Sequence, residues 1–218
     1  MTDVSAPATI TFAPSELVVL FGDRFTPEAG MLGSKEEVLT SGIKVNSEKL
    51  MSAAVGAAVW AAHRAGAIRL ELRQGKALFG LIKTQKLHVV PGTGASPFPA
   101  HSLESIVVDA ARTSPELQKL LEAFIGGEVM DVPAHVLGRI KAGMAERGLL
   151  GREERKTMMV FTTVGFTLPD ATKAAAGRES LDAVQSLLRD AEQREPALAK
   201  AVRDDIDGAR VMMTESRD

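Results

Sequence analysis

Residues 50–62 read LMSAAVGAAVWAA, an apolar run that only one serine and one glycine interrupt. A helix that crosses a bilayer needs about 20 mainly apolar residues, so this run is too short to span a membrane. Asn46 or Ser47 can cap a helix just before the run, and Gly66 supplies the residue type that commonly ends one. The stretch therefore predicts a buried central helix over residues 48–65.

The composition fits a mainly α fold, a single globular helical domain with a small β-sheet and a protruding β-hairpin. Of 218 residues, 45% are hydrophobic and 25% are charged, as in ordinary globular domains. Aromatic residues make up only 4%, so aliphatic side chains and methionine must build the core, which favours packed helices. We expect a flexible arm over residues 1–13, the helical domain over residues 14–190 and a polar helix or tail over residues 191–218.

Two observations predict the compartment. The chain has no cysteine, which excludes disulfides and thiol chemistry and fits a reducing cytosol. Its first residues have neither the basic start nor the apolar run of a signal peptide. We therefore expect a cytoplasmic protein.

Strand signals follow the central helix. Residues 68–72 alternate between apolar and charged side chains, which is the pattern of a half-buried strand. Gln74-Gly75 predicts a turn into a second strand over residues 77–82. Residues 87–90 predict a third strand.

Helix boundaries are marked in the middle of the chain. A capping residue, a proline and an acidic residue follow one another at residues 114–116. This order predicts the start of a helix, which ends at Gly126. Asp131 predicts the start of the next helix, which runs to Gly148.

A hairpin is predicted after this helix. Residues 158–163 are apolar and β-branched, and Val164-Gly165 can turn the strand back. Val164 and Phe166 would then flank an exposed turn. Together with Phe161, they predict contact with a membrane or with a second copy of the chain, because exposed apolar tips usually meet a partner.

A search for reactive groups finds no set that supports catalysis or metal binding. The four histidines, His63, His88, His101 and His135, lack the spacing of a metal site. Ser41 and Lys44 match a serine–lysine spacing without its companion motifs. No stretch combines a nucleophile, a base and an oxyanion site. We expect no enzyme activity, no metal and no cofactor.

The formal net charge of −2 conceals a strong segregation of charge along the chain. Residues 64–86 contain six basic residues and one acidic residue, and residues 139–156 contain six basic and three acidic ones. The segment from residue 179 onward contains ten acidic and six basic residues. Each basic residue near an anionic lipid surface contributes about 1 kcal/mol to binding, so the two basic stretches predict an anionic partner.

Three stretches carry a resemblance to a known family. AAVWAAHRAGAIRLE at residues 57–71 looks like the family's apolar helix entering a strand, and PFPAHSLESI at residues 97–106 sits where the family has a helix after a short loop. The most specific stretch is RIKAGMAERGLL at residues 139–150, followed by the charged segment and the hairpin. In these features the chain resembles the Golgi phosphoprotein 3 family, over about residues 14–188.

The resemblance implies a mostly helical cytosolic protein that docks on membranes by binding phosphatidylinositol 4-phosphate, and whose hairpin serves self-association or membrane contact. The family's lipid pocket uses a tryptophan and an arginine at the start of the apolar helix and two arginines early in the long helix. The corresponding positions here are Asn46, Val55, Ala134 and Leu137, which supply neither an indole nor a guanidinium group.

Our leading hypothesis is a non-enzymatic protein that binds phosphoinositide or another anionic lipid at the cytosolic face of a membrane. The candidate lipid or phosphate ligands are Arg64, Arg69, Arg139, Arg147 and Arg152, and the candidate hairpin residues are Phe161, Val164 and Phe166. One alternative is an interaction adaptor that self-associates through the hairpin. Another is a winged-helix-like DNA-binding protein, which the balanced net charge and the acidic residues beside the wing make the less favoured reading.

Overall fold

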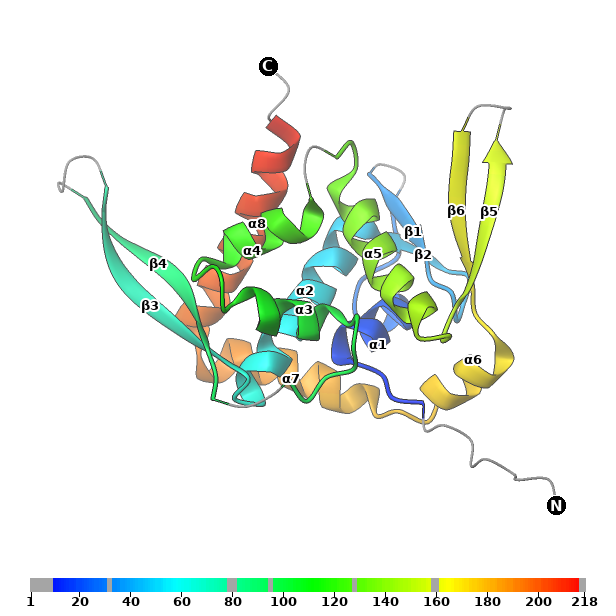
Figure 1. The fold of residues 1–218 in the computed structure, drawn as a ribbon, viewed down its shortest axis with the longest axis horizontal. Helices are drawn as coiled ribbons and strands as arrows, with labels where there is room; N and C mark the ends of the chain where they lie inside the picture. The colour runs from blue at the N-terminus through cyan, green and yellow to red at the C-terminus, as the bar shows by residue number, and fades with distance from the viewer. Residues whose placement is uncertain are drawn as a thin grey trace.

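The structure, a computed structural model, describes residues 10–30, 33–77, 82–93, 96–126, 129–157 and 161–215. Its central element is α2 (Ser47–Arg64), which Figure 1 shows in the middle of the molecule. Asn46 caps this helix by accepting a hydrogen bond from the Lys49 N–H at 2.9 Å. Gly66 follows the helix with a φ of +70°. The central buried helix that residues 50–62 predict is therefore confirmed.

Most of the other helices pack around α2 and share one hydrophobic core with it. These are α1 (Pro14–Leu20), α3 (Leu103–Ala110), α5 (Val132–Glu146), α7 (Leu181–Arg194) and α8 (Pro196–Glu215). The short helices η1 (Gly22–Arg24), α4 (Leu117–Ile125) and α6 (Asp170–Ala176) complete the helical part. The expectation of a mainly α fold is confirmed. No helix in the described ranges is both long and apolar enough to cross a bilayer.

Local capping signals explain where α4 and α5 end and begin. Gly126 ends α4 in the left-handed conformation, at φ +81°, and Asp131 caps α5 by accepting from the Ala134 N–H at 3.0 Å. The start of α4 differs from the prediction, because the helix begins only at Leu117. Pro115 instead lies beside Val89, whose N–H donates to the Pro115 carbonyl at 2.7 Å.

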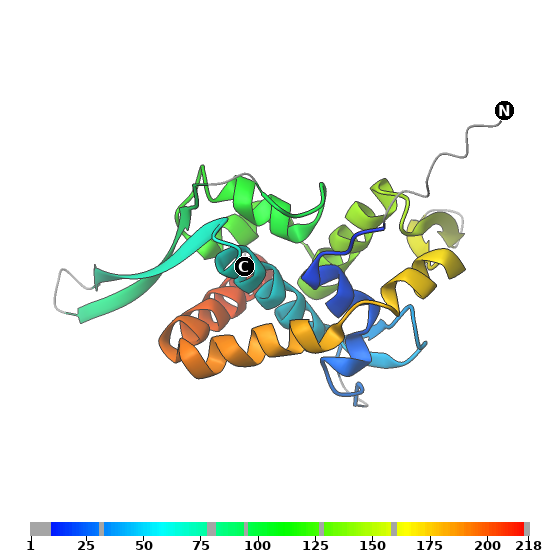
Figure 2. The same ribbon diagram turned by 90° about the horizontal axis from the view of Figure 1, so that it is seen from below.

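All strands lie in antiparallel pairs, which form three separate two-stranded sheets in the described residues. The pairs are β1 (Lys35–Glu37) with β2 (Lys44–Asn46), β3 (Ile68–Ala77) with β4 (Ile82–Pro91), and β5 (Gly151–Thr157) with β6 (Phe161–Thr167). Figures 1 and 2 show the β3–β4 and β5–β6 hairpins at opposite ends of the helical body.

The predicted turn at Gln74-Gly75 is wrong. Gln74 pairs with Gln85 and Gly75 with Thr84, so both residues lie inside a ladder of ten residue pairs. A glycine marks a turn only where the chain needs its conformational freedom, and an antiparallel ladder accepts glycine at a cost in stability. The first expected strand therefore continues to Ala77, Ile82 begins β4, and the rest of the strand expected over residues 77–82 lies outside the described residues.

The predicted turn at Val164-Gly165 is also wrong, because Val164 lies opposite Glu154 within β6. The charged stretch before residue 158 forms β5 instead of a turn, and residues 158–160 lie outside the described residues. A hairpin that faces water on both sides accepts charged residues in its strands. The register leaves Val164 41% exposed, whereas Phe166 is half-buried and packs against the core.

The segment expected as a polar helix or tail contains the helix α8, one face of which belongs to the core. Its inward face buries Ala199, Val202, Ile206 and Ala209. These residues recur every three or four positions, so they form one stripe along the helix. The stripe packs mainly against α4, α7 and α2.

Candidate functional site

Three of the five candidate arginines have partners within the protein. Arg64, at the end of α2, lies 3.4 Å from a carboxylate oxygen of Asp190 on α7. Arg147 forms an ion pair with the buried Glu16 of α1. Arg139 donates to the carbonyl of Phe124. Each of these arginines joins two elements of the fold.

The other two candidates, Arg69 and Arg152, are exposed on different hairpins. Arg69 lies on β3 and Arg152 on β5, and these strands stand at opposite ends of the molecule (Figure 1). The five arginines therefore do not form one surface. Phe161 begins β6 opposite Thr157, the last residue of β5, and Val164 follows three residues later.

The four positions that correspond to the family's lipid pocket do not line one basic concavity. Val55 and Leu137 are buried in the core, at 2% and 0% exposure. Asn46 uses its side-chain oxygen to cap α2, and Ala134 is an exposed residue of α5. In this fold, two of the four positions serve packing and one serves helix capping.

The basic residues of the first central stretch are concentrated on the β3–β4 hairpin. Its strands contain five basic residues and one acidic residue, Glu71. The hydrogen bond that Arg73 donates lowers the pKa of Glu71 below its usual range. The register then places Arg73 opposite Lys86, and Lys76 opposite Lys83. Like charges directly opposite each other in a hairpin are destabilising, so the Arg73–Lys86 pair forms a site of positive potential.

A pair of buried carboxyl groups connects α1 with α3. The Ser15 N–H donates to Glu104 Oε1 at 2.7 Å and the Ser15 hydroxyl to Oε2 at 2.8 Å. Burial, with a smaller contribution from the neighbouring charge of Glu16, raises the pKa of Glu104 to about 7. Burial also raises the pKa of Glu16, although the Arg147 guanidinium opposes this effect. The core therefore holds two carboxyl groups whose pKa values burial raises above the usual range.

Sequence reasoning missed this carboxyl pair. Glu16 and Glu104 each lie in the first turn of a helix. An acidic residue there ordinarily interacts favourably with the helix dipole or completes a cap. Glu16 does accept the Ala13 N–H at 2.9 Å in this way. Nothing in the local pattern indicates that α1 and α3 bring the two side chains into the same buried region.

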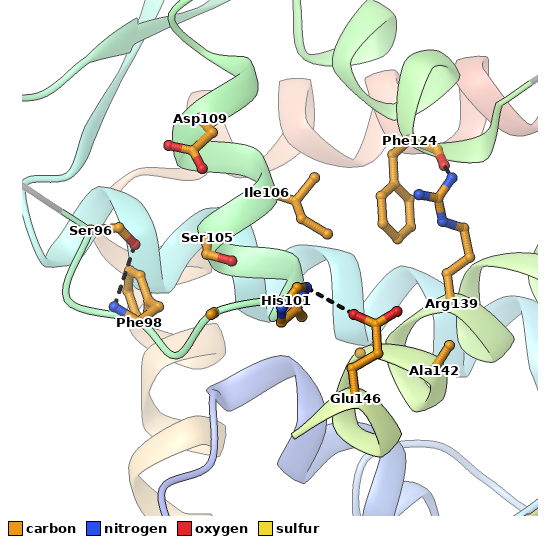
Figure 3. Close-up of a pocket in the computed structure, with 12 residues that line it drawn as sticks. Ser96, Phe98, His101, Ser105, Ile106, Asp109, Phe124, Arg139, Ala142 and Glu146 are labelled. Carbon is orange, nitrogen blue, oxygen red and sulfur yellow. Dashed lines mark hydrogen bonds and ion pairs between the residues drawn. The ribbon is translucent and has the colours of Figure 1, made fainter. Parts of the chain in front are cut away.

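A cleft of about 620 Å³ lies between α3, α4 and α5 (Figure 3). The polar residues that line it are Ser96, His101, Ser105, Asp109, Arg139 and Glu146, and its large apolar residues are Phe98, Ile106 and Phe124. His101 Nδ1 lies 2.9 Å from a carboxylate oxygen of Glu146. The described residues contain no group of three or more side chains that could hold a metal ion.

His101, on one wall of the cleft, has a strained backbone conformation. His101 has a φ of +62° and is the only described residue other than glycine with a positive φ. Its carbonyl approaches α5 so closely that a Cβ at Gly143 would lie 2.2 Å from the oxygen. The left-handed conformation costs a residue other than glycine about 1–2 kcal/mol. The close contact of the His101 backbone with Gly143 of α5 accompanies this conformation, in which the His101 ring lies beside Glu146.

The comparisons with known proteins assign no family. No protein-family model matches the chain, and a search of curated proteins finds none similar to it. The resemblance to the Golgi phosphoprotein 3 family stays a prediction from the sequence. A function must therefore be argued from the surfaces described above.

Proposed function

We propose that this protein is a peripheral membrane-binding protein that attaches reversibly to an anionic lipid surface through its β3–β4 hairpin. The observation that carries the proposal is the position of this hairpin, which projects from the helical body and has a net charge of about +4 from five basic residues and one acidic residue (Figure 1). The proposed function is binding to lipid and involves no catalysed reaction.

A partner would stabilise the outer half of the β3–β4 hairpin. Ile68, Leu70, Leu87 and Val89 are buried at its root, where β3 and β4 contact α2, α4 and α8. Ten residues in a strand extend about 30 Å, so the outer part reaches well beyond this root. A two-stranded hairpin by itself is marginally stable in water. An external surface would stabilise it.

Charge complementarity favours a lipid surface as that partner. The register places Arg73 directly opposite Lys86, and anionic head groups would relieve the repulsion between these two charges. At about 1 kcal/mol per basic residue, a net charge of +4 corresponds to about 4 kcal/mol of binding free energy at low salt. This free energy corresponds to a partition coefficient of roughly a thousand, which is compatible with reversible attachment.

Co-sedimentation with vesicles tests the proposal. Phosphatidylcholine vesicles with and without phosphatidylserine are compared at low and high salt. We expect recovery with phosphatidylserine at low salt only, because salt screens exposed charges. The double variant Arg73→Gln/Lys86→Gln should bind about 30-fold more weakly, since it removes about 2 kcal/mol. No recovery of the wild type at low salt would refute the proposal.

Matched controls separate the hairpin from overall charge. Lys173 and Arg178 are exposed at the other end of the molecule, so Lys173→Gln/Arg178→Gln makes the same charge change away from the hairpin and should bind nearly as well as wild type. Vesicles with phosphatidylinositol 4-phosphate in place of phosphatidylserine, at equal total charge, test head-group recognition. Equal recovery is expected, because Val55 and Leu137 are buried apolar residues.

Self-association through the β5–β6 hairpin is a second candidate, favoured by the exposed Val164 and by the unpaired outer edges of this two-stranded sheet. Sedimentation velocity of wild type and Val164→Lys tests it. A dimer that Val164→Lys dissociates supports pairing, and a monomeric wild type at high protein concentration rejects it. Phe166 is unsuitable for this test because it packs against the core.

Binding of DNA by α5 and this hairpin is less favoured. A winged-helix reader needs basic side chains that are free to reach phosphates. Arg147 is instead paired with the buried Glu16, and the hairpin contributes Glu153 and Glu154 next to Arg152.

A further inference from the structure

We propose that the cleft between α3, α4 and α5 binds a small organic anion, whose phosphate or carboxylate group contacts Arg139 and whose apolar body lies against Phe124 and Ile106. This site is distinct from the β3–β4 hairpin and does not depend on the proposed membrane attachment. The proposal rests on the charge balance within the cleft, on the fixed position of Arg139 and on the shape of the cleft.

Arg139 is the cation in the cleft whose charge is not matched by a carboxylate. His101 faces Glu146 at 2.9 Å, and Asp109 faces Arg112 at 3.8 Å. Both partners of Arg139 are uncharged: the carbonyl of Phe124 accepts its hydrogen bond, and the ring of Phe124 lies 4.6 Å from the guanidinium carbon. Within the described ranges, no carboxylate lies at ion-pair distance from Arg139. Its positive charge therefore remains available to a ligand.

The guanidinium group is also held in place. The contacts to the carbonyl and ring of Phe124 orient it at the edge of the cleft (Figure 3). An arginine that is already oriented loses less conformational entropy when it binds a phosphate or carboxylate, and its planar group can offer two parallel hydrogen bonds. Figure 3 shows Ile106 between Arg139 and Asp109, so the Asp109 carboxylate stands apart from the guanidinium.

The rest of the cleft suits an apolar ligand body. Phe124 is buried, and Ile106, Ala142 and Gly143 extend the apolar surface beside it. The volume of about 620 Å³ lies within the range of small-molecule sites. The contact of His101 with Gly143 closes one side of the cleft despite its conformational cost. Strain of this kind is concentrated at functional sites.

Isothermal titration with four soluble probes tests the proposal: phenyl phosphate, benzoate, inorganic phosphate and phenol. We expect saturable binding of at least one of the first two, because both combine an anionic group with an aromatic body. Inorganic phosphate and phenol should each bind at least about tenfold more weakly, since each lacks one of the two contacts. If neither phenyl phosphate nor benzoate binds saturably, or if inorganic phosphate binds equally well, the proposal is wrong.

Substitutions in and outside the cleft test where the anionic probes bind. Arg139→Gln should weaken the anionic probes at least about tenfold, because a hydrogen bond to a charged group is worth about 1.5–3 kcal/mol. Arg178→Gln, an equal loss of charge at an exposed position just after α6, should bind like wild type. Ala142→Phe fills the cleft from a half-exposed helix position while keeping Arg139, and it should also weaken binding. Unchanged binding in both Arg139→Gln and Ala142→Phe, with circular dichroism confirming folded proteins, would place the site elsewhere.

Discussion

Replacing Glu104 by glutamine should make the protein more stable at neutral and alkaline pH. The Glu104 carboxyl group is fully buried, and its hydrogen bonds go to the backbone N–H and the hydroxyl of Ser15. A glutamine can keep both contacts, since its carbonyl oxygen accepts from the N–H and its amide donates to the hydroxyl. The substitution therefore removes the ionisation of this group without leaving a buried polar atom unpaired.

The magnitude follows from the pKa difference between the two states. Burial raises the pKa of Glu104 from 4.5 to about 7, a difference of about 2.5. At 1.36 kcal/mol for each unit, the folded state loses about 3 kcal/mol when the buried group ionises. Because the folded pKa is the higher one, this stability is complete below pH 4.5, decreases as the pH rises and is lost above about pH 7. The Glu104→Gln protein has no such group to ionise.

Urea unfolding of wild type and Glu104→Gln at a series of pH values provides the measurement. We expect the variant's advantage in unfolding free energy to grow by about 3 kcal/mol between acid and mildly alkaline pH. Asp205 titrates in part of the same window, since burial raises its pKa to about 6, but its effect cancels in the difference between the two proteins. Glu37→Gln removes an exposed carboxyl group and should parallel wild type. A difference that stays constant with pH would refute the reasoning.

Three further substitutions test the packing, and urea unfolding measures each. Gly143→Ala should cost about 1–3 kcal/mol, because its Cβ would overlap the His101 carbonyl; unchanged stability would contradict the close approach. Arg147→Met should cost about 3–5 kcal/mol near neutral pH by leaving Glu16 buried and unpaired, and Glu16→Gln in the same chain should restore part of that loss. Asp131→Ala should cost about 1 kcal/mol through the lost cap of α5, and a cost near zero would exclude a stabilising cap.

The boundaries of helices could be predicted where the signal is local. Asn46, Gly66, Gly126 and Asp131 each act on backbone groups within a few residues of themselves. A cap or a left-handed glycine therefore works in the same way whatever packs around it. The start of α4 was missed because Pro115 bonds to a strand that is distant in the sequence.

Both protruding hairpins were predicted with the wrong turn. A Gln-Gly or Val-Gly pair marks a chain reversal only if the register of the two strands puts it between them, and register depends on the pairing of the whole ladder. Val164 and Phe166 were therefore expected side by side near a tip. In the structure they are neighbours along β6, and their exposure differs because only Phe166 packs against the core.

The cleft was invisible in the sequence for a similar reason. His101 reads as an isolated histidine, and the glycine at position 143 reads as a weak point in a helix. Only the tertiary structure shows that the His101 carbonyl lies against Gly143 and that Arg139 lines the same cleft.

By itself, the sequence determined the central apolar helix, the mainly α class, the caps and the segregation of charge. These properties follow from composition and from neighbours along the chain. The tertiary structure decided which charges are available to a partner. Arg147 is neutralised by Glu16, 131 residues away, whereas Arg69 remains exposed on a hairpin. The availability of a charge depends on what folding places beside it, and a pattern of residue types cannot specify contacts over such separations.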